Sequence, residues 1–270
     1  MNRTGFRPLF RPALARRRAL FAMAVALLGA GTSSRAAEPA LRLYTEEYAP
    51  YNYTIKGKPS GLSVEIVMEL QRRMRLDIPI EVVPWARGYR SASTEPWVGL
   101  FVTARTAERE PLFQWVGPIS ATRAHLYARR GEQTGIRSLD DARKVPQIMV
   151  PREWYIHQDL RSRGFTNLEP VSTPADAMRM LLANRSVVIA MDESTVAETM
   201  RLAGLVSDPP EPIVKISEAL LYIAFSKGTP AEVVQRWQQT LDEMKRDGSF
   251  AAIHQRWLPG VPLPSAPAAR

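Results

Sequence analysis

Strand-like and helix-like segments alternate along residues 41–258, and this alternation limits the possible folds more than any other feature of the sequence. Val98–Thr103 is a continuous apolar run, as expected for a strand buried on both faces of a parallel sheet. Alternating segments are typical of α/β proteins, which bind ligands at the carboxyl ends of their strands. The predicted strands are Leu41–Thr45, Ile80–Val83, Val98–Thr103, Leu126–Ala128, Gln147–Val150, Val187–Met191 and Leu221–Phe225.

Helix signals fall between these strands. Gly61–Met74 carries a single apolar stripe at helical spacing. Thr173–Asp176 and Thr229–Glu232 share the order Thr-Pro-Ala-acid, which predicts a threonine cap, proline in the first turn and an acid three residues after the cap. A short final helix is expected to carry Phe250 and Trp257.

The first 36 residues have the features of an export signal and are set apart from the fold. A basic stretch ending at Arg16–Arg18 precedes the apolar run Ala19–Ala30, and small residues continue to Ala36. The run has about 12 residues, fewer than the roughly 20 of a membrane-spanning helix. We therefore expect cleavage after Ala36 and a soluble periplasmic protein, exported by the Sec route. Arg17–Phe21 also loosely resembles a twin-arginine signal.

Composition excludes several classes of function. Residues 1–36 hold seven arginines and no acid, while the net charge of all 270 residues is +9. The rest of the chain therefore carries little net charge, which gives little reason to expect nucleic-acid binding. The absence of cysteine excludes disulfides, zinc–thiolate sites and a cysteine nucleophile, and the three histidines are far apart in sequence. We expect no metal and no cofactor.

Four stretches, in this order and at this spacing, resemble the family 3 extracellular solute-binding proteins, the polar amino-acid receptors of ABC importers. The resemblance covers nearly all of residues 41–258. The stretches are Tyr48-Ala49-Pro50-Tyr51, Ser60-Gly61-Leu62-Ser63-Val64-Glu65, Thr106-Ala107-Glu108-Arg109 with Trp115-Val116-Gly117-Pro118, and Asp247-Gly248-Ser249-Phe250 with Trp257.

The resemblance implies a monomer with a type II periplasmic-binding-protein fold. Each of its two α/β lobes would hold a mixed, mainly parallel sheet flanked by helices, with the ligand cleft between the lobes. The hinge crossings would lie near Ser120–Arg123 and Ser217–Tyr222. Lobe one would comprise residues 37–120 and 221–260, lobe two residues 121–220, and a flexible tail residues 261–270.

Arg109 and Asp192 are the main candidate ligand-binding residues. Thr106 is expected to cap a helix after Val98–Thr103, which would place the Arg109 guanidinium beside free backbone N–H groups that suit a carboxylate. The resemblance implies that Arg109 binds the α-carboxylate of the ligand and Asp192 its α-ammonium. Asp192 is also a candidate N-cap for a helix over Glu193–Met200.

Aromatic residues and one further acid complete the predicted site. The resemblance implies that Tyr48 and Trp85 pack against the ligand, whereas Tyr51 matches a position that is usually structural. Glu46 matches an acid often found in receptors for basic amino acids, and Glu47 fits the same position nearly as well.

Three departures from the family pattern argue against an ordinary α-amino acid as ligand. Ala104 lacks the hydroxyl that is usual at its position. Glu153 and Trp154 replace a glycine and a small hydroxyl residue, so Trp154 is expected to reduce or reshape the cleft. Glu95-Pro96-Trp97-Val98-Gly99 replaces the usual Gly-x-x-Asp before the third strand. Phe101 and Thr103 are expected to line the same strand end as Ala104 and to make the pocket less polar.

The leading interpretation is a periplasmic solute-binding protein that delivers a small carboxylate-bearing ligand to an ABC permease, without catalysis. The alternatives are a dehydratase-like enzyme on the same scaffold and a ligand-loaded partner of a membrane sensor. Glu46, Glu47 or Glu153 would be the general acid of the enzyme. Neither a paired-carboxylate motif nor a nucleophile–histidine spacing favours it, and His157 is expected at the surface.

Overall fold

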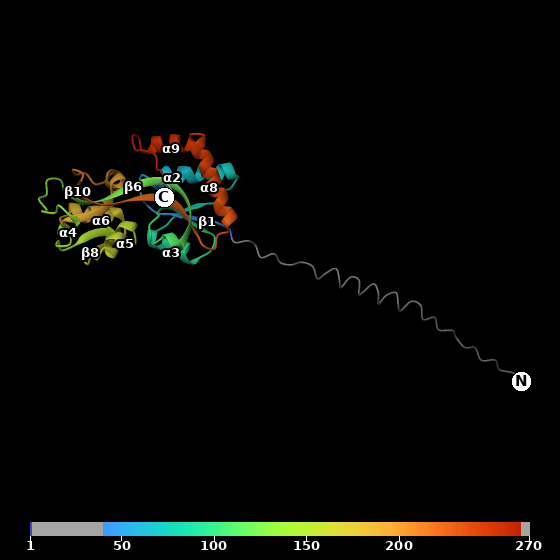
Figure 1. Ribbon diagram of the computed structural model, residues 1–270, viewed down its shortest axis with the longest axis horizontal. Coiled ribbons are helices and arrows are strands. Elements are labelled where there is room, and N and C mark those ends of the chain that lie inside the picture. The colour runs from blue at the N-terminus through green and yellow to red at the C-terminus, as the bar shows by residue number, and fades with distance from the viewer. Residues whose placement is uncertain (2–39, 266–270) are drawn as a thin grey trace. The chain divides into compact units, whose positions relative to one another are not determined.

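Eight strands form one mixed sheet in the order β4-β1-β5-β10-β6-β9-β7-β8, and β2 and β3 form a separate hairpin (Figure 1). In this computed structural model, residue 1 and residues 40–265 are described; the predicted export signal and residues 266–270 lie outside them. The strands are β1 Arg42–Thr45, β2 Tyr53–Ile55, β3 Lys58–Ser60, β4 Ile80–Val82, β5 Val98–Ala104, β6 Phe113–Ala128, β7 Ile148–Pro151, β8 Leu168–Val171, β9 Val188–Asp192 and β10 Glu211–Ser226.

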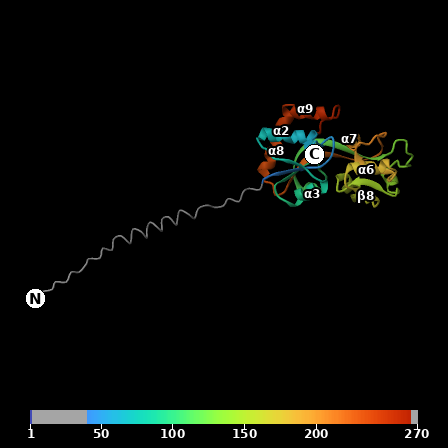
Figure 2. The same ribbon diagram turned by 180° about the vertical axis from the view of Figure 1, so that it is seen from behind.

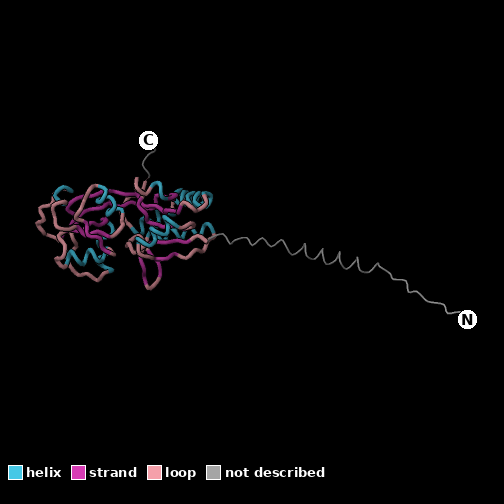
Figure 3. Tube along the Cα trace, turned by 90° about the horizontal axis from the view of Figure 1, so that it is seen from below, coloured by secondary structure: helices cyan, strands magenta, loops and turns pink. Residues whose placement is uncertain are grey.

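Helices alternate with these strands along the chain (Figure 3). The α-helices are α2 Leu62–Met74, α3 Trp85–Thr94, α4 Leu139–Ala142, α5 Tyr155–Ser162, α6 Pro174–Leu182, α7 Val196–Leu202, α8 Ala231–Arg246 and α9 Ser249–Trp257, and the 3-10 helices are η1 Glu110–Leu112 and η2 Glu193–Thr195. Within residues 40–265, no helix has the length and hydrophobicity needed to cross a bilayer.

The sheet consists of two parallel groups joined by an antiparallel pair. Strand β1 runs parallel to β4 and β5, and β7 runs parallel to β8 and β9. We call β4-β1-β5 the first half and β9-β7-β8 the second half of the sheet. The antiparallel strands β10 and β6 lie between them. The predicted α/β class with a mixed, mainly parallel sheet is confirmed.

Strands β6 and β10 have 16 residues each and run through both halves. Leu221–Phe225 of β10 pairs with β5, whereas Ala124–Tyr127 of β6 pairs with β9. The predicted strands over Leu126–Ala128 and Leu221–Phe225 are only the ends of these long strands. Their other parts carry exposed polar residues, which interrupt the apolar runs that predict a strand.

The two segments predicted as hinge crossings lie side by side where β6 pairs with β10. Ser120 lies opposite Leu221, and Arg123 lies opposite Glu218. Between the two halves the chain therefore continues through paired strands rather than through free loops.

Helices cover both faces of the sheet. In the first half, α2, α8 and α9 pack together on one side and α3 lies on the other (Figure 1 and Figure 2). In the second half, Met149 and Ile189 pack in one cluster with α6 and α7, while Ile148 and Val150 pack in another with α5. Because successive strand residues point to opposite faces, both faces of this half are apolar.

The two Thr-Pro-Ala-acid segments begin helices in different ways. Thr173 caps α6, since its Oγ1 accepts the N–H of Asp176 at 3.1 Å, as predicted. The predicted cap at Thr229 is wrong. Pro230 occupies the N-cap position of α8, and the Thr229 hydroxyl instead pairs with Oγ of Ser226 at 3.0 Å, in the turn that closes β10.

Candidate functional site

A cavity of about 20 Å³ lies where the carboxyl ends of β1, β4 and β5 meet those of β7 and β9. Both parallel groups thus contribute to one site, as expected for an α/β sheet. A cavity of this size holds about one water molecule. The residues that line it are Glu46, Tyr48, Trp85, Val102, Ala104, Arg109, Trp154, Tyr155, Asp192 and Leu221.

Six of the eight predicted site residues line this cavity. Glu46 and Tyr48 follow β1, Trp85 begins α3 after β4, and Arg109 follows β5. The other two predicted residues that reach the cavity, Trp154 and Asp192, come from the second half, Trp154 following β7 and Asp192 ending β9.

The α-helix predicted between β5 and β6 does not form. Thr106 Oγ1 does accept the N–H of Arg109 at 3.3 Å, but only the three-residue 3-10 helix η1 follows. Strand β6 begins at Phe113, so too few residues remain for an α-helix. The predicted helix N-terminus beside Arg109 is therefore wrong.

Groups from both halves of the sheet surround the guanidinium of Arg109, a residue that is 1% exposed. Its Nε donates to Oε1 of Gln158 at 2.9 Å, and its Nη2 donates to the carbonyl of Glu153 at 3.0 Å. The rings of Trp85 and Tyr89 each lie 5.0 Å from the guanidinium carbon. Burial lowers the pKa of Arg109. Among residues 40–265, no carboxylate forms an ion pair with this cation.

Trp85 binds the same carbonyl as Arg109. Its indole N–H donates to the Glu153 carbonyl at 2.7 Å, and its ring stacks on Tyr89. Glu153 has a φ of 58°, which is uncommon for a residue with a side chain. In this conformation the Glu153 carbonyl accepts hydrogen bonds from Arg109 and Trp85, both of the first half.

The Asp192 carboxylate is fully buried and accepts three hydroxyl hydrogen bonds. Tyr48 donates to Oδ2, while Thr122 and Tyr155 donate to Oδ1 at 2.8 and 2.5 Å. Burial raises the pKa of Asp192, and these hydrogen bonds oppose that shift. Asp192 occupies the predicted N-cap position of η2, which begins at Glu193, but its side chain makes no cap hydrogen bond.

Of the two candidate acids, Glu46 lines the cavity and Glu47 does not. Oε2 of Glu46 accepts the indole N–H of Trp154 at 2.9 Å. Burial raises the pKa of Glu46 from 4.5 to about 8, so its carboxyl is mostly protonated at neutral pH. Glu47 is exposed and binds Thr54 instead.

A tight loop presents Tyr48 to the cavity. The Tyr48 ring stacks on Tyr51 at 5.1 Å and meets the Trp154 ring edge-on at 4.7 Å. Ser63, in the first turn of α2, donates to the Tyr51 carbonyl at 2.7 Å. A Cβ on Gly61 would lie 2.4 Å from that carbonyl oxygen, which explains why glycine precedes α2.

Phe101 and Thr103 were expected to line the strand end, but the structure does not bring them to this cavity. Val102 has no partner on β10 and has a φ of 64°, so it forms a bulge in β5. Val102 and Ala104 line the cavity instead. Phe101 is buried in the core, and the Thr103 hydroxyl donates to the Leu100 carbonyl.

Sequence reasoning missed the partners of the charged residues. Tyr155 and Thr122 bind Asp192, and Gln158 binds Arg109. Gln158 could have been found from its position four residues after the predicted site residue Trp154, because this spacing places two residues on the same face of a helix. His157 was expected at the surface and is buried; its Nδ1 accepts the N–H of Glu153, and burial lowers its pKa.

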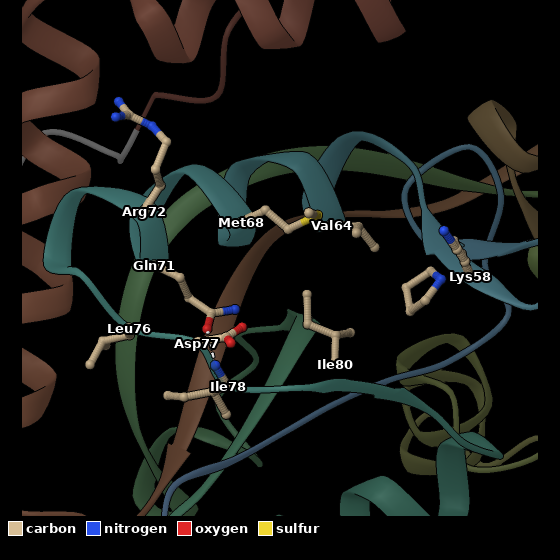
Figure 4. A pocket seen from close by; sticks show the side chains of 10 residues that line it. Lys58, Val64, Met68, Gln71, Arg72, Leu76, Asp77, Ile78 and Ile80 are labelled. Atoms are coloured by element: carbon tan, nitrogen blue, oxygen red, sulfur yellow. Dashed lines mark hydrogen bonds between the residues drawn. The ribbon is translucent and has the colours of Figure 1, made fainter.

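Larger hollows lie elsewhere and contain none of the eight predicted site residues, although Glu47, the alternative to Glu46, lines one of them. One of these hollows, of about 480 Å³, lies between α2 and β4. It is lined mainly by apolar side chains such as Val64, Met68 and Ile80 (Figure 4). Gln71 of α2 reaches across it to the N–H of Ile78. The 20 Å³ cavity remains the candidate site, because buried charges converge there from both halves of the sheet. The described part of the chain contains no cluster of three or more potential metal ligands.

Comparison with known proteins agrees with the resemblance seen in the sequence. The model of the bacterial extracellular solute-binding proteins, family 3, matches residues 41–260. The L-cystine-binding protein TcyA of Bacillus subtilis (strain 168) is 22% identical over 218 residues, 78% of this chain and 78% of that protein.

Two solved structures illustrate the shared fold. A histidine kinase sensor domain with similarity to periplasmic binding proteins has a TM-score of 0.75 and 22% identity, covering 83% of this chain and 98% of its own. ArtJ, the arginine-, lysine-, histidine-binding protein of Geobacillus stearothermophilus, has a TM-score of 0.72 and 16% identity, covering 83% of this chain and 97% of its own.

Proposed function

Because this chain belongs to the family 3 bacterial extracellular solute-binding proteins, we propose that it captures a small carboxylate-bearing ligand for an ABC importer. The ligand is an amino acid or an amino-acid derivative. TcyA, ArtJ and a lysine-bound ABC transporter component from Wolinella succinogenes support this class. The proposed form is a periplasmic monomer that has lost residues 1–36 and docks on a membrane permease.

The unpaired guanidinium of Arg109 carries this proposal. A buried charge is costly unless it is paired, and Arg109 has only neutral acceptors around it among the described residues. A ligand carboxylate would supply the missing negative charge through two parallel N–H···O bonds.

We also propose that capture is coupled to movement of two lobes. We assign residues 40–120 and 221–260 to one lobe and residues 121–220 to the other, with the hinge where β6 pairs with β10. Opening would separate Arg109 and Trp85 from the Glu153 carbonyl. Closure around a ligand would exclude water and strengthen the charged contacts at Arg109.

Calorimetry of the chain from residue 37 onward against amino acids and related carboxylates tests this function. Arg109→Ala should weaken binding of the best ligand by about 3 kcal/mol or more, roughly a hundredfold, because a charge-assisted bidentate pair is lost. Arg90→Ala changes an exposed arginine of α3 and is the matched control. Unchanged affinity in a folded Arg109→Ala protein would refute the proposal.

A second candidate function is favoured by one observation, the burial of the Glu46 carboxyl, which raises its pKa. A carboxylic acid with a pKa of about 8 is suited to donate a proton at neutral pH, as a dehydratase acting on a carboxylic acid requires. A turnover assay with prephenate-like acids, on the wild type and on Glu46→Gln, separates this enzyme from a binding protein.

A further inference from the structure

We infer that the cavity is built for a carboxylate that carries no α-ammonium group, such as a 2-hydroxy or 2-oxo acid. This inference rests on the proposed function and narrows its ligand class to amino-acid derivatives in which the α-ammonium group is replaced. Three arguments carry it: the hydrogen bonds of Asp192, the state of Glu46 and the donors of Arg109.

Asp192 has little capacity left for an ammonium group. A carboxylate offers about four acceptor positions, and Tyr48, Thr122 and Tyr155 already occupy three of them. An α-ammonium has three N–H donors and would find only the one remaining position, on Oδ2, unless it displaced one of these hydroxyls. The phenols of Tyr48 and Tyr155 are buried, so a displaced phenol would lose its partner at a cost comparable to the new contact.

Glu46 does not replace Asp192 as an ammonium acceptor. Its carboxylate oxygen already binds Trp154, and burial keeps its pKa at about 8. In the protonated form Glu46 carries no charge to attract an ammonium. The same form can donate a hydrogen bond to an anionic oxygen.

Arg109, by contrast, retains donors for an anion. A guanidinium has five N–H groups. Gln158, the Glu153 carbonyl and, at 3.5 Å, the Ala104 carbonyl account for three of them. Nη1 and Nη2 each keep one further N–H, so the cavity offers donors to an anion but no free carboxylate to a cation.

The size of the cavity adds a limit. About 20 Å³ admits no organic acid beside the indole of Trp154, so a ligand must take the place of that ring. Displacing it frees the Glu46 carboxyl, which accepts the indole N–H, to meet the incoming acid.

Matched ligands test the inference directly. Leucine, phenylalanine and lysine are each compared by calorimetry with the 2-hydroxy and 2-oxo acids of the same side chain. The inference expects at least one ammonium-free acid to bind about tenfold or more tightly than its amino acid. Equal or tighter binding of the amino acids overturns the inference and leaves the proposed function standing. No binding of any carboxylate overturns both.

Two tyrosine variants sharpen the test. Tyr48→Phe removes one hydroxyl donor and leaves both acceptor positions of Asp192 Oδ2 open, so the affinity ratio should shift toward the amino acid by roughly fivefold or more. Tyr51→Phe is the matched control, because the Tyr51 hydroxyl bonds Ser194 and the Ala121 carbonyl instead. An unchanged ratio in folded Tyr48→Phe contradicts the assigned role of the Asp192 hydrogen bonds.

Discussion

The indole N–H of Trp154 donates a 2.9 Å hydrogen bond to the carboxyl of Glu46 and so joins the two halves of the sheet. The Trp154 side chain is 5% exposed, and its ring also meets Tyr48 edge-on. An aromatic side chain therefore fills the place between Glu46 and Tyr48 in which a ligand would lie. We therefore expect ligand selection to depend on the size of residue 154 as well as on the charges around it.

Replacing Trp154 by glycine should widen the range of ligands that bind. Removal of the indole enlarges the cavity and frees Glu46, while loss of a large buried side chain should cost about 3–5 kcal/mol of stability. A thermal-shift screen of amino acids, hydroxy acids and aromatic acids compares the variant with the wild type. Trp115→Gly, which changes a half-buried tryptophan outside the cavity, is the control. An identical ligand profile in Trp154→Gly would exclude Trp154 from the site.

Glu46 should make the protein less stable as the pH rises from about 4.5 to about 8. Burial raises the pKa of the folded-state carboxyl to about 8, whereas the unfolded chain ionises near 4.5. The folded state thus binds more protons in this window, and stability should fall by up to about 1.4 kcal/mol per pH unit. Denaturant titrations between pH 5 and pH 9 measure this slope, which Glu46→Gln should flatten.

The groups around Glu46 do not reverse this sign. Arg109 favours the ionised form and Asp192 opposes it, and burial also raises the pKa of Asp192. Glu47→Gln changes the neighbouring exposed acid and should retain the wild-type slope. A slope in Glu46→Gln equal to that of the wild type would show that Glu46 ionises normally in the folded protein.

The carboxyl ends of the parallel strands could be predicted because short apolar runs mark them. Glu46, Arg109 and Asp192 each follow or end such a run, which is why the sequence points to the edge of the sheet where the cavity lies. The partners of Asp192 could not be predicted in this way. Tyr48, Thr122 and Tyr155 lie 144, 70 and 37 positions from it in sequence, so only the folded chain brings them together.

Three parts of the fold lack a clear sequence signal for physical reasons. β8 contains Pro170 and an exposed Glu169, as edge strands often do, and so lacks an apolar run. α3 contains Gly88 and several weak helix formers. The bulge at Val102 reverses the expected alternation of inward and outward side chains along β5. It could not be predicted from the sequence, because a β-branched residue rarely adopts a positive φ.

Thr173→Ala should destabilise the protein by about 1 kcal/mol, because α6 loses the hydroxyl that accepts the N–H of Asp176. The melting temperature should fall by a few degrees. Thr94→Ala is the control, since the exposed Thr94 hydroxyl only donates back to the Arg90 carbonyl at the end of α3. Equal melting temperatures for Thr173→Ala and the wild type would show that the cap contributes nothing.

Gln158→Glu should block the anion site without removing Arg109. The new carboxylate would occupy the position of the Gln158 amide oxygen, 2.9 Å from Nε of Arg109, and would form the ion pair that the wild-type guanidinium lacks among the described residues. Ligand carboxylate would then compete with an internal one, so affinity should fall by about tenfold or more while the protein stays folded. Gln255→Glu adds the same charge on the exposed surface of α9 and should bind as the wild type does. Calorimetry with the best ligand measures both variants, and a Gln158→Glu protein with undiminished affinity would mean that the ligand carboxylate is bound elsewhere.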